Sequence, residues 1–506
     1  MNFLKILFGE EKITGISVIE AVSIETTCDM QELAKFLNSN IQSKSLHYNT
    51  DEYFGENIYF FKNDQNHIVF SKSIKLILET FSDQEVNINL DQELTHAYYD
   101  AGFIIPPFTP YERIFVLPQY SRICFINDEI IIDYYHPALE GDTGFEGVDE
   151  FSETLKRSTQ SIAKRSAEDE NLICTLSGGA DSSILLYYLS QCGLQSLYSY
   201  TCSMPSAPLE EVKAKKISKQ LDIENIVFNY NEDKSSDYVD QFVEKNLMPV
   251  YDPIVPVFSS MIESLNSNKR FSDKRNIIIE GQSADTIFLG LPHNILINLY
   301  TKNASYIFKF LNLLMPRYNQ KNSLLSRFFY RLIKLIDALS EATWHDAFLR
   351  SLDHDKSKYP KYYSYLSELL LDIFKKTKNK HHSISIFFLY INQIREFQKY
   401  RLLPENFEIQ TPYLRNEIIS KSMHTKSTFF TKGLKKKIPI FLLINRMFPG
   451  IIRDNQTLPF YVNYKFDSKT TKNGSEMEED SYLSLKRYSI ILIKSYIDNL
   501  NTKNHH

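Results

Sequence analysis

Hydrophobic residues follow two different patterns along the chain, and the change between them falls near residue 150. Up to about residue 145, short runs rich in β-branched and aromatic residues alternate with turn residues, as in GENIYFFKND (55–64) and YERIFVLPQYSRICFIND (111–128). Such runs are typical of β-strands. Residues 86–103 instead have apolar residues three and four apart, as in a helix, and prolines follow. The pattern predicts an N-terminal α+β layered domain.

From about residue 171 the chain repeats an apolar run, a turn and an amphipathic helical segment. Strands that alternate with helices at this spacing favour a parallel sheet with right-handed crossovers. Most of 305–450 has helical spacing and predicts a large helical layer beside that sheet. The whole chain is therefore expected to be α/β. The apolar runs are NLICTL (171–176), SLYSYT (196–201), ENIVFNY (224–230) and NIIIEG (276–281).

A polar, acidic segment with three glycines, residues 137–157, separates the two patterns. Glycine-rich polar segments of this kind are typical of domain boundaries. We therefore expect one domain over 1–147 and a second over 148–465. The remainder, 466–506, begins with the polar stretch DSKTTKNGSEMEED and is expected to be a mobile polar tail.

Composition narrows the function classes only modestly. The 57 basic and 62 acidic residues give a net charge of −5, which provides no electrostatic reason to expect a nucleic-acid partner. The five cysteines form no CxxC pair and are interpreted as free thiols of a reducing compartment. The apolar run at the N-terminus is too short for a signal peptide or a membrane span. We expect a cytoplasmic protein without a membrane partner.

The candidate chemistry begins at ICTLSGGADSSILLYYL, residues 173–189. SGGAD stands between a buried strand and a helix, where glycines let backbone N–H groups converge and the helix dipole adds positive potential. The turn therefore predicts an anion site, although a plain glycine-rich turn is the alternative. No lysine follows the glycines, which excludes a GxxxxGK[ST] loop, and Asp181 suits a metal ion that bridges phosphate oxygens.

The order SGGADS in this setting resembles the pyrophosphate loop of N-type ATP pyrophosphatases. Two further segments extend the resemblance to the asparagine synthetase family, over about residues 59–460. IIIEGQSADTIFLG (277–290) offers a second strand, glycine turn and acid, and residues 98–120 resemble the end of the family's N-terminal domain. The resemblance implies a glutaminase-like first domain of the N-terminal-nucleophile type and an ATP pyrophosphatase second domain.

The resemblance also implies ATP and Mg²⁺ as cofactors. Family members activate a carboxylate as an acyl-adenylate, release pyrophosphate, and let an amine attack the adenylate. By resemblance Asp181 and Asp285 would bind Mg²⁺ and, with Gln282, Glu408 and Arg453, would hold catalytic positions. Tyr200 and Thr201 are either contacts for the adenine of ATP or ordinary residues at the end of a strand. The residues expected at ATP or pyrophosphate are Leu176, Ser177, Gly178, Gly179, Asp181, Ser182, Tyr200, Thr201 and Gly281.

Two departures bear on the source of the amine. Glutamine-using members carry a cysteine after the initiator methionine, which serves as nucleophile and, through its α-amine, as base. This chain has Asn2, and its first cysteine is Cys28, so glutamine hydrolysis is not expected. The family turn GEGxDE reads GQSADT here and places Gln282 where the family has a Glu, or a Tyr in β-lactam synthetases. A glutamine cannot take a proton, so the base must lie elsewhere.

Two further departures concern the C-terminal part of the resemblance. Glu408 matches the first residue of the family's ExRxPFL segment, but Gln410 replaces its Arg and Arg415 its following Asp, so a structural ion pair is the alternative role. The family's RxK lysine falls at Asn455 or Thr457. Either Arg453 or Lys465 substitutes for it, or the late step is impaired. The basic run 431–437 either reaches phosphates or is a solvated helix start.

The favoured hypothesis is an AMP-forming ligase that uses an amine of the substrate itself, with lasso-peptide macrolactam formation as the specific case. Its partners would be a peptide or small-molecule carboxylate and, in the lasso-peptide case, a leader-peptide-processing protein. A β-lactam-synthetase-like amide ligase and a catalytically degenerate nucleotide-binding protein are the alternatives. Sulfur transfer to RNA is disfavoured because paired cysteines and a basic domain are missing.

Overall fold

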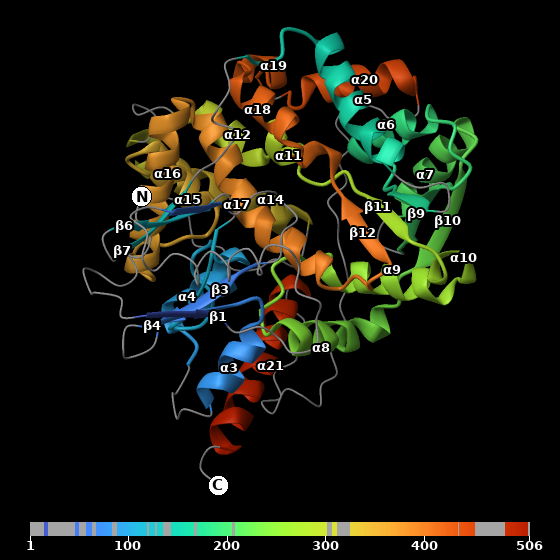
Figure 1. The fold of residues 1–506 in the computed structure, drawn as a ribbon. Helices are drawn as coiled ribbons and strands as arrows, with labels where there is room; N and C mark the ends of the chain where they lie inside the picture. Colours follow the sequence, from blue (N-terminus) through green and yellow to red (C-terminus); the bar gives the residue numbers. More distant parts are fainter. Residues whose placement is uncertain are drawn as a thin grey trace.

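The strands of the described residues form three sheets in the computed structural model (Figure 1). Two sheets belong to the first 147 residues and the third to the rest of the chain, so the α/β class predicted from the sequence is confirmed. The structure describes residues 15–18, 46–49, 57–62, 67–82, 89–118, 121–126, 129–134, 143–165, 170–204, 208–300, 306–310, 324–433, 435–450 and 481–503.

The two N-terminal sheets have the strand orders β1-β4-β3-β5 and β2-β6-β7. β1 pairs with β4 in parallel, and the other neighbours are antiparallel. The strands are β1 (Gly15–Val18), β2 (Leu46–Asn49), β3 (Tyr59–Lys62), β4 (His67–Ser71), β5 (Ile114–Val116), β6 (Ser121–Ile126) and β7 (Glu129–Tyr134).

Helix α4 (Gln92–Ala101) fulfils the helical prediction for 86–103. The Asp91 side chain accepts a hydrogen bond from Leu94 N at 2.9 Å and so caps the helix start. Gly102, with φ of 84°, ends the helix in the left-handed conformation that favours glycine. Helix α3 (Ile74–Ser82) is the other helix described in this part of the chain.

The third sheet is parallel throughout, with the order β10-β9-β8-β11-β12. From β8 the chain moves outward to β9 and β10, then returns to place β11 on the other side of β8. In open parallel sheets, ligands bind at the carboxyl ends of strands where the order reverses in this way. The strands are β8 (Asn171–Thr175), β9 (Leu197–Ser203), β10 (Glu224–Asn229), β11 (Asn276–Ile279) and β12 (Phe407–Gln410).

Successive residues of the central strands enter two different cores, because side chains alternate across a strand. Leu172 and Cys174 of β8 belong to the large core, whereas Ile173 belongs to a smaller core on the opposite face. Ile278 of β11 repeats this alternation in the smaller core. Burial on both faces explains why these strands are almost continuously apolar.

The helical layer predicted for 305–450 is present in the described part of that range, and α17 contacts α9 and α11 beside the sheet (Figure 1). Strand β12 was not predicted within this range. No helix of the described residues is both long and apolar enough to cross a membrane. The helices of this part are α5 (Val148–Arg165), α6 (Ala180–Ser190), α7 (Pro208–Gln220), α8 (Ser235–Asn246), α9 (Val255–Ser267), α10 (Lys269–Ser272), α11 (Ala284–Ile287), α12 (Pro292–Leu299), α14 (Leu324–Leu339), α15 (Trp344–Ser351), α16 (Pro360–Thr377), α17 (Lys380–Tyr400), α18 (Asn416–His424), α19 (Ser427–Phe430) and α20 (Ile438–Met447), with 3₁₀ turns η2 (Glu232–Lys234) and η3 (Pro412–Leu414).

The expectation of a mobile polar tail over 466–506 was wrong for its second half. Residues Ser481–Lys503 form helix α21, which contacts α3, α4 and α8 at the bottom of Figure 1. Leu485, Ile490 and Ile493 are fully buried, because apolar residues recur there at helical spacing after a polar stretch that masked the pattern. The boundary at 465 lies outside the described residues, and the division at 147 stays a prediction.

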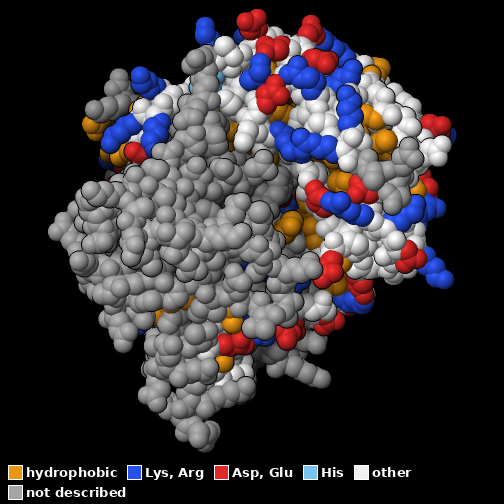
Figure 2. All heavy atoms as spheres, viewed as in Figure 1, with side chains coloured by type: hydrophobic (Ala, Val, Ile, Leu, Met, Phe, Trp, Pro, Cys, Tyr) orange, Lys and Arg blue, Asp and Glu red, His pale blue; other side chains and the backbone are white. Residues whose placement is uncertain are grey.

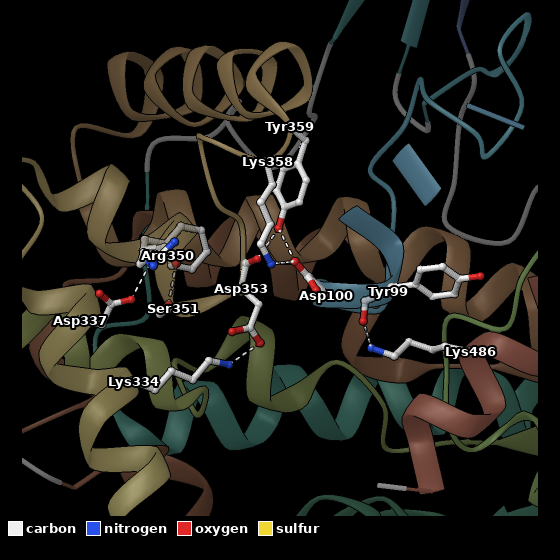
Figure 3. Close-up of polar contacts among 11 residues, drawn as sticks. Tyr99, Asp100, Lys334, Asp337, Arg350, Ser351, Asp353, Lys358, Tyr359 and Lys486 are labelled. Carbon is white, nitrogen blue, oxygen red and sulfur yellow. Dashed lines mark hydrogen bonds and ion pairs between the residues drawn. The ribbon is translucent and has the colours of Figure 1, made fainter. Parts of the chain in front are cut away.

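Polar contacts also join α21 and the helical layer to the end of α4 (Figure 3). Lys486 of α21 donates a hydrogen bond to Tyr99 O at 2.5 Å. Lys358, just before α16, donates to Asp100 Oδ2 at 2.8 Å, and the Tyr359 hydroxyl donates to the same oxygen at 3.2 Å. The C-terminus of α4 is thus held from two sides by residues more than 250 positions away.

We expect the substitution Ile490→Ala in α21 to lower the free energy of unfolding by about 2–5 kcal/mol, because it leaves a cavity in a fully buried position. Urea unfolding measures the change, and Lys494→Ala, an exposed position of the same helix, is the matched control. Equal stability of the two variants would contradict the packing of α21 described above.

Candidate active site

Two turns meet at the carboxyl ends of β8 and β11. The first, residues 176–179, leads into α6, and the second, residues 280–283, leads into α11. A Cβ on Gly281 would lie 3.0 Å from the backbone nitrogen of Ser182, so a side chain there would press against the start of α6. Gly178 has φ of 71°, and a Cβ there would lie 2.7 Å from Lys213 Cβ of α7. Glycine is required at both turns for the backbones to approach.

The start of α6 suits an anion. Gly179 is its N-cap and supplies no side-chain hydrogen bond to the first turn, so backbone N–H groups and the helix dipole face the turn. The Ser177 hydroxyl accepts a hydrogen bond from Gly179 N at 3.3 Å and lies 3.4 Å from the Ser182 hydroxyl. The structure therefore brings Ser177, Gly178, Gly179 and Ser182 together as the sequence predicted.

Asp181 and Asp285 also converge, and a lysine joins them. Lys437 Nζ lies 2.5 Å from Asp181 Oδ2 and 3.2 Å from Asp285 Oδ1. Burial lowers the pKa of Lys437, but the two carboxylates outweigh burial and raise it above its ordinary value. Lys437 is 5% exposed, so the solvated-helix interpretation of the run 431–437 is wrong for its last residue.

The two carboxylates fit a magnesium ion shared with phosphate. Asp181 Oδ1 is buried without a hydrogen-bond partner, and the Asp285 side chain is 53% exposed, so each retains a free oxygen. No group of three or more His, Cys, Asp or Glu side chains that could hold a metal occurs among the described residues. Phosphate oxygens and water would have to complete the coordination, which is how Mg²⁺ is usually held beside nucleotides.

A buried charge cluster lies behind Gln282. Lys399 Nζ of α17 is 2.6 Å from Glu280 Oε2 and 3.4 Å from Glu396 Oε2, and it donates a hydrogen bond to Gln282 Oε1. Burial raises the pKa of Glu396 to about 8, and Lys399 offsets part of that effect. The sequence analysis did not identify Glu280, Glu396 or Lys399. Two charged residues three apart within the buried segment of α17 are the signal that could have found them.

A pocket of about 260 Å³ opens beside this cluster and the second turn. Asn392 shapes one wall by donating hydrogen bonds to the hydroxyls of Ser283 and Thr286, each at 3.0 Å. The pocket therefore combines polar turn atoms with an apolar wall and one guanidinium. Its lining residues include Gln282, Asp285, Thr286, Leu291, Phe388, Asn392 and Arg395.

The side chains of Tyr200 and Thr201 are buried and make contacts within the protein interior. The Tyr200 hydroxyl donates to Ser264 Oγ at 2.7 Å, and the Tyr200 ring stacks on Phe228. The Thr201 hydroxyl donates to Leu176 O at 2.9 Å. These contacts favour the ordinary strand-end alternative for both side chains, while Leu176 itself leads directly into the first turn.

Glu408 is not brought to the two turns. It pairs in register with Ile277 of β11, four residues before Gly281, which corresponds to about 13 Å of strand. Its carboxylate accepts a hydrogen bond from Arg275 at 2.8 Å, in agreement with the structural alternative. Arg453, Lys465, Asn455, Thr457, Asn2 and Cys28 lie outside the described residues.

The surface around α5, α6 and α20 carries basic and acidic side chains side by side (Figure 2). Ion pairs account for part of this mixing, since Arg446 of α20 contacts Asp149 of α5 at 2.8 Å and Lys421 contacts Glu150. The described part of this face thus reflects the nearly balanced charge of the sequence.

A known protein family and a solved structure are similar to parts of this chain. The family model for asparagine synthase matches residues 153–493, which is more than half of the chain. An NH3-dependent NAD synthetase from Campylobacter jejuni subsp. jejuni NCTC 11168, solved with a nitrate ion, is similar at 13% identity, with a TM-score of 0.22 over 44% of this chain and 95% of that one. No curated protein sequence matches. The chain belongs to the asparagine synthase family, and it is an ATP-using ligase of carbon–nitrogen bonds.

Proposed function

We propose that the protein activates a substrate carboxylate as an acyl-adenylate, with release of pyrophosphate, and forms an amide with an amine that the substrate itself carries. The convergence of the two glycine turns at the β8–β11 switch point is the observation that supports it most strongly. The open start of α6 would bind the pyrophosphate part of ATP. Gln282, where the family has an acid for amide formation, supports a nucleophile other than free ammonia.

Asp181 and Asp285 are the residues that would hold magnesium. When bound, the ion would draw negative charge from the phosphate oxygens that leave. Ser177 and Ser182 would orient the same oxygens through their hydroxyls. The protein's contribution at this end of the site is thus to position the polyphosphate and neutralise it.

Gln282 would orient the reacting acyl group. Lys399 has only hydrogen-bond donors, so its bond occupies the Oε1 of Gln282 and leaves the Nε2 hydrogens as donors toward the pocket. A donor in that place can bind a carboxylate or acyl oxygen. It cannot deprotonate an amine, so the base must be another group, of the protein or of the substrate.

Macrolactam closure of a lasso peptide is the specific case we favour, with a peptide substrate and a leader-peptide-processing protein as partners. A β-lactam-synthetase-like ligase for a small amino acid derivative would use the same groups. A degenerate nucleotide-binding protein is the remaining alternative, because Gln282 replaces the family's acid and no RxK lysine follows α20.

Mass spectrometry of the protein with Mg²⁺, ATP and linear precursor peptides or amino-bearing carboxylates tests the proposal. We expect AMP and a substrate that has lost one water, in equal amounts. Asp285→Ala should abolish both products, because it removes a residue that faces the polyphosphate. Release of ADP in place of AMP, or ATP binding without AMP for every substrate, would contradict the proposed reaction.

A further inference from the structure

The ammonium of Lys437 lies between the two carboxylates that the site offers to a metal ion. Its Nζ contacts Asp181 Oδ2 at 2.5 Å and Asp285 Oδ1 at 3.2 Å, so one cation spans both acids. The contact is built into the fold. A Cβ on Gly290 would lie 2.2 Å from Asp285 Oδ1 and 2.5 Å from Lys437 Cδ, so only glycine at this position leaves room for the pair.

The backbone of Lys437 is held in place, whereas its side chain can change rotamer. It is the N-cap of α20, with φ of 51°, and its carbonyl accepts a hydrogen bond from Phe441 N at 3.1 Å. The side chain ends in a compact charge on four rotatable methylenes. The Asp285 carboxylate is half exposed, so the ammonium can turn from the acids toward a group that enters from solvent.

A magnesium ion and this ammonium compete for the same oxygens. Mg²⁺ needs oxygen ligands at about 2.1 Å in near-octahedral arrangement. The ammonium already occupies one oxygen of each acid, and its positive charge repels a second cation at the free Asp181 Oδ1. A polyphosphate changes this balance, because its negative charge can attract the metal and the ammonium together.

We propose that Lys437 is the resident counter-ion of Asp181 and Asp285, and that it turns to the polyphosphate when nucleotide and metal bind together. The nucleotide part rests on the proposed function, whereas the charge compensation does not. Lys437 then has two consequences for this chain. Free divalent metal binds poorly without nucleotide, and the ammonium supplies a phosphate-neutralising cation in a chain that lacks the family's RxK lysine.

Metal binding without nucleotide is the first test. Mn²⁺ is titrated into the full-length protein and followed by electron paramagnetic resonance, with Lys437→Met, Asp285→Asn and the control Lys361→Met, an exposed lysine of α16. We expect the wild type and the control to bind Mn²⁺ no more tightly than about 1 mM, a weak site by protein standards. Lys437→Met should bind it at least about tenfold more tightly, because a positive charge is gone.

Nucleotide binding is the second test. With Mn²⁺ present, α,β-methylene-ATP should bind the wild type and the control equally, whereas Lys437→Met should lose about tenfold in affinity for the analogue because one phosphate contact is missing. Tighter Mn²⁺ binding together with weaker analogue binding is a pair of effects that general loosening of the fold would not produce.

Several results would overturn the counter-ion role. Tight Mn²⁺ binding by the nucleotide-free wild type that disappears in Asp285→Asn would do so, and this arm needs no Lys437 variant to fold. Unchanged Mn²⁺ affinity in a folded Lys437→Met would do so too. Failure of the analogue to bind the wild type would instead count against the proposed function, and the nucleotide-free comparison would still decide the counter-ion role.

Discussion

Replacement of Lys399 with methionine is expected to lower the free energy of unfolding by about 3–5 kcal/mol at pH 8, because removal of one partner of a buried ion pair leaves uncompensated charge. Lys399 is 1% exposed, and the carboxylates of Glu280 and Glu396 at 2.6 and 3.4 Å would lose their ammonium. Methionine fills similar volume, so lost packing contributes little.

The loss should depend on pH in a defined direction. Burial raises the pKa of Glu396 to about 8 in the fold, whereas a glutamate in the unfolded chain has a pKa of about 4.3. Because its pKa is raised, Glu396 binds protons more tightly in the folded state than in the unfolded state. Its contribution to the free energy of unfolding is therefore fully present below about pH 4.3 and is lost as the pH rises toward 8. Without the ammonium of Lys399 the pKa of Glu396 rises further, so stability depends more strongly on pH. The free energy of unfolding that Lys399→Met loses should be small at pH 5 and should reach its full value at pH 8.

Urea unfolding at the two pH values measures the effect. Lys399→Met combined with Glu396→Gln should recover part of the loss at pH 8, because one buried carboxylate is gone. The exposed Lys361→Met should unfold as the wild type does. Equal stability of Lys399→Met and wild type at pH 8 would show that the cluster is not a buried ion network.

Replacement of Asp181 with asparagine is expected to lower the rate of AMP formation by about 10³-fold, comparable to the loss of a preorganised electrostatic contact in other active sites. The residue stands in the first turn of α6, contacts Lys437 at 2.5 Å, and keeps a second oxygen buried without a partner. Asparagine preserves the shape and removes the charge. Asp285 still lies 3.2 Å from Lys437, so the loss of stability should be smaller than in Lys399→Met.

Steady-state release of AMP with a competent substrate gives the rate, and Asp149→Asn is the control, since its carboxylate is 90% exposed at the start of α5. The control should retain wild-type activity. An Asp181→Asn variant that keeps more than about a tenth of the activity would remove Asp181 from the reaction, because that loss corresponds to only about 1.4 kcal/mol.

The two turns were predictable because their signals are local. In both SGGADS and EGQSAD, glycine and an acid follow a strand within a few residues. Adjacent parallel strands then bring their carboxyl ends together. Lys437 was not assigned because its contact with Asp181 joins residues 256 positions apart. No pattern within the run 431–437 distinguishes this lysine from Lys432 and Lys435, which are exposed.

Other differences have equally physical causes. β12 has four residues in a helical region, too few to show an alternating pattern, yet it completes the sheet beside β11. Glu396 and Lys399 interrupt the apolar face of α17, and only the packed structure shows that they face Glu280 and not solvent. Tyr200 and Thr201 do not end their strand, because β9 continues to Ser203. Their side chains are buried in contacts with Ser264, Phe228 and Leu176.

The position of α21 has a consequence for how this protein is made. Its buried residues pack beside α3, α4 and α8, and Lys486 reaches the backbone of Tyr99. A ribosome adds about 5–20 residues each second, so α21, which begins 235 residues after the end of α8, is made roughly 10–50 s later. Helices α3, α4 and α8 therefore exist for that time without the helix that covers part of their apolar surface. Apolar surface exposed in this way during synthesis favours aggregation.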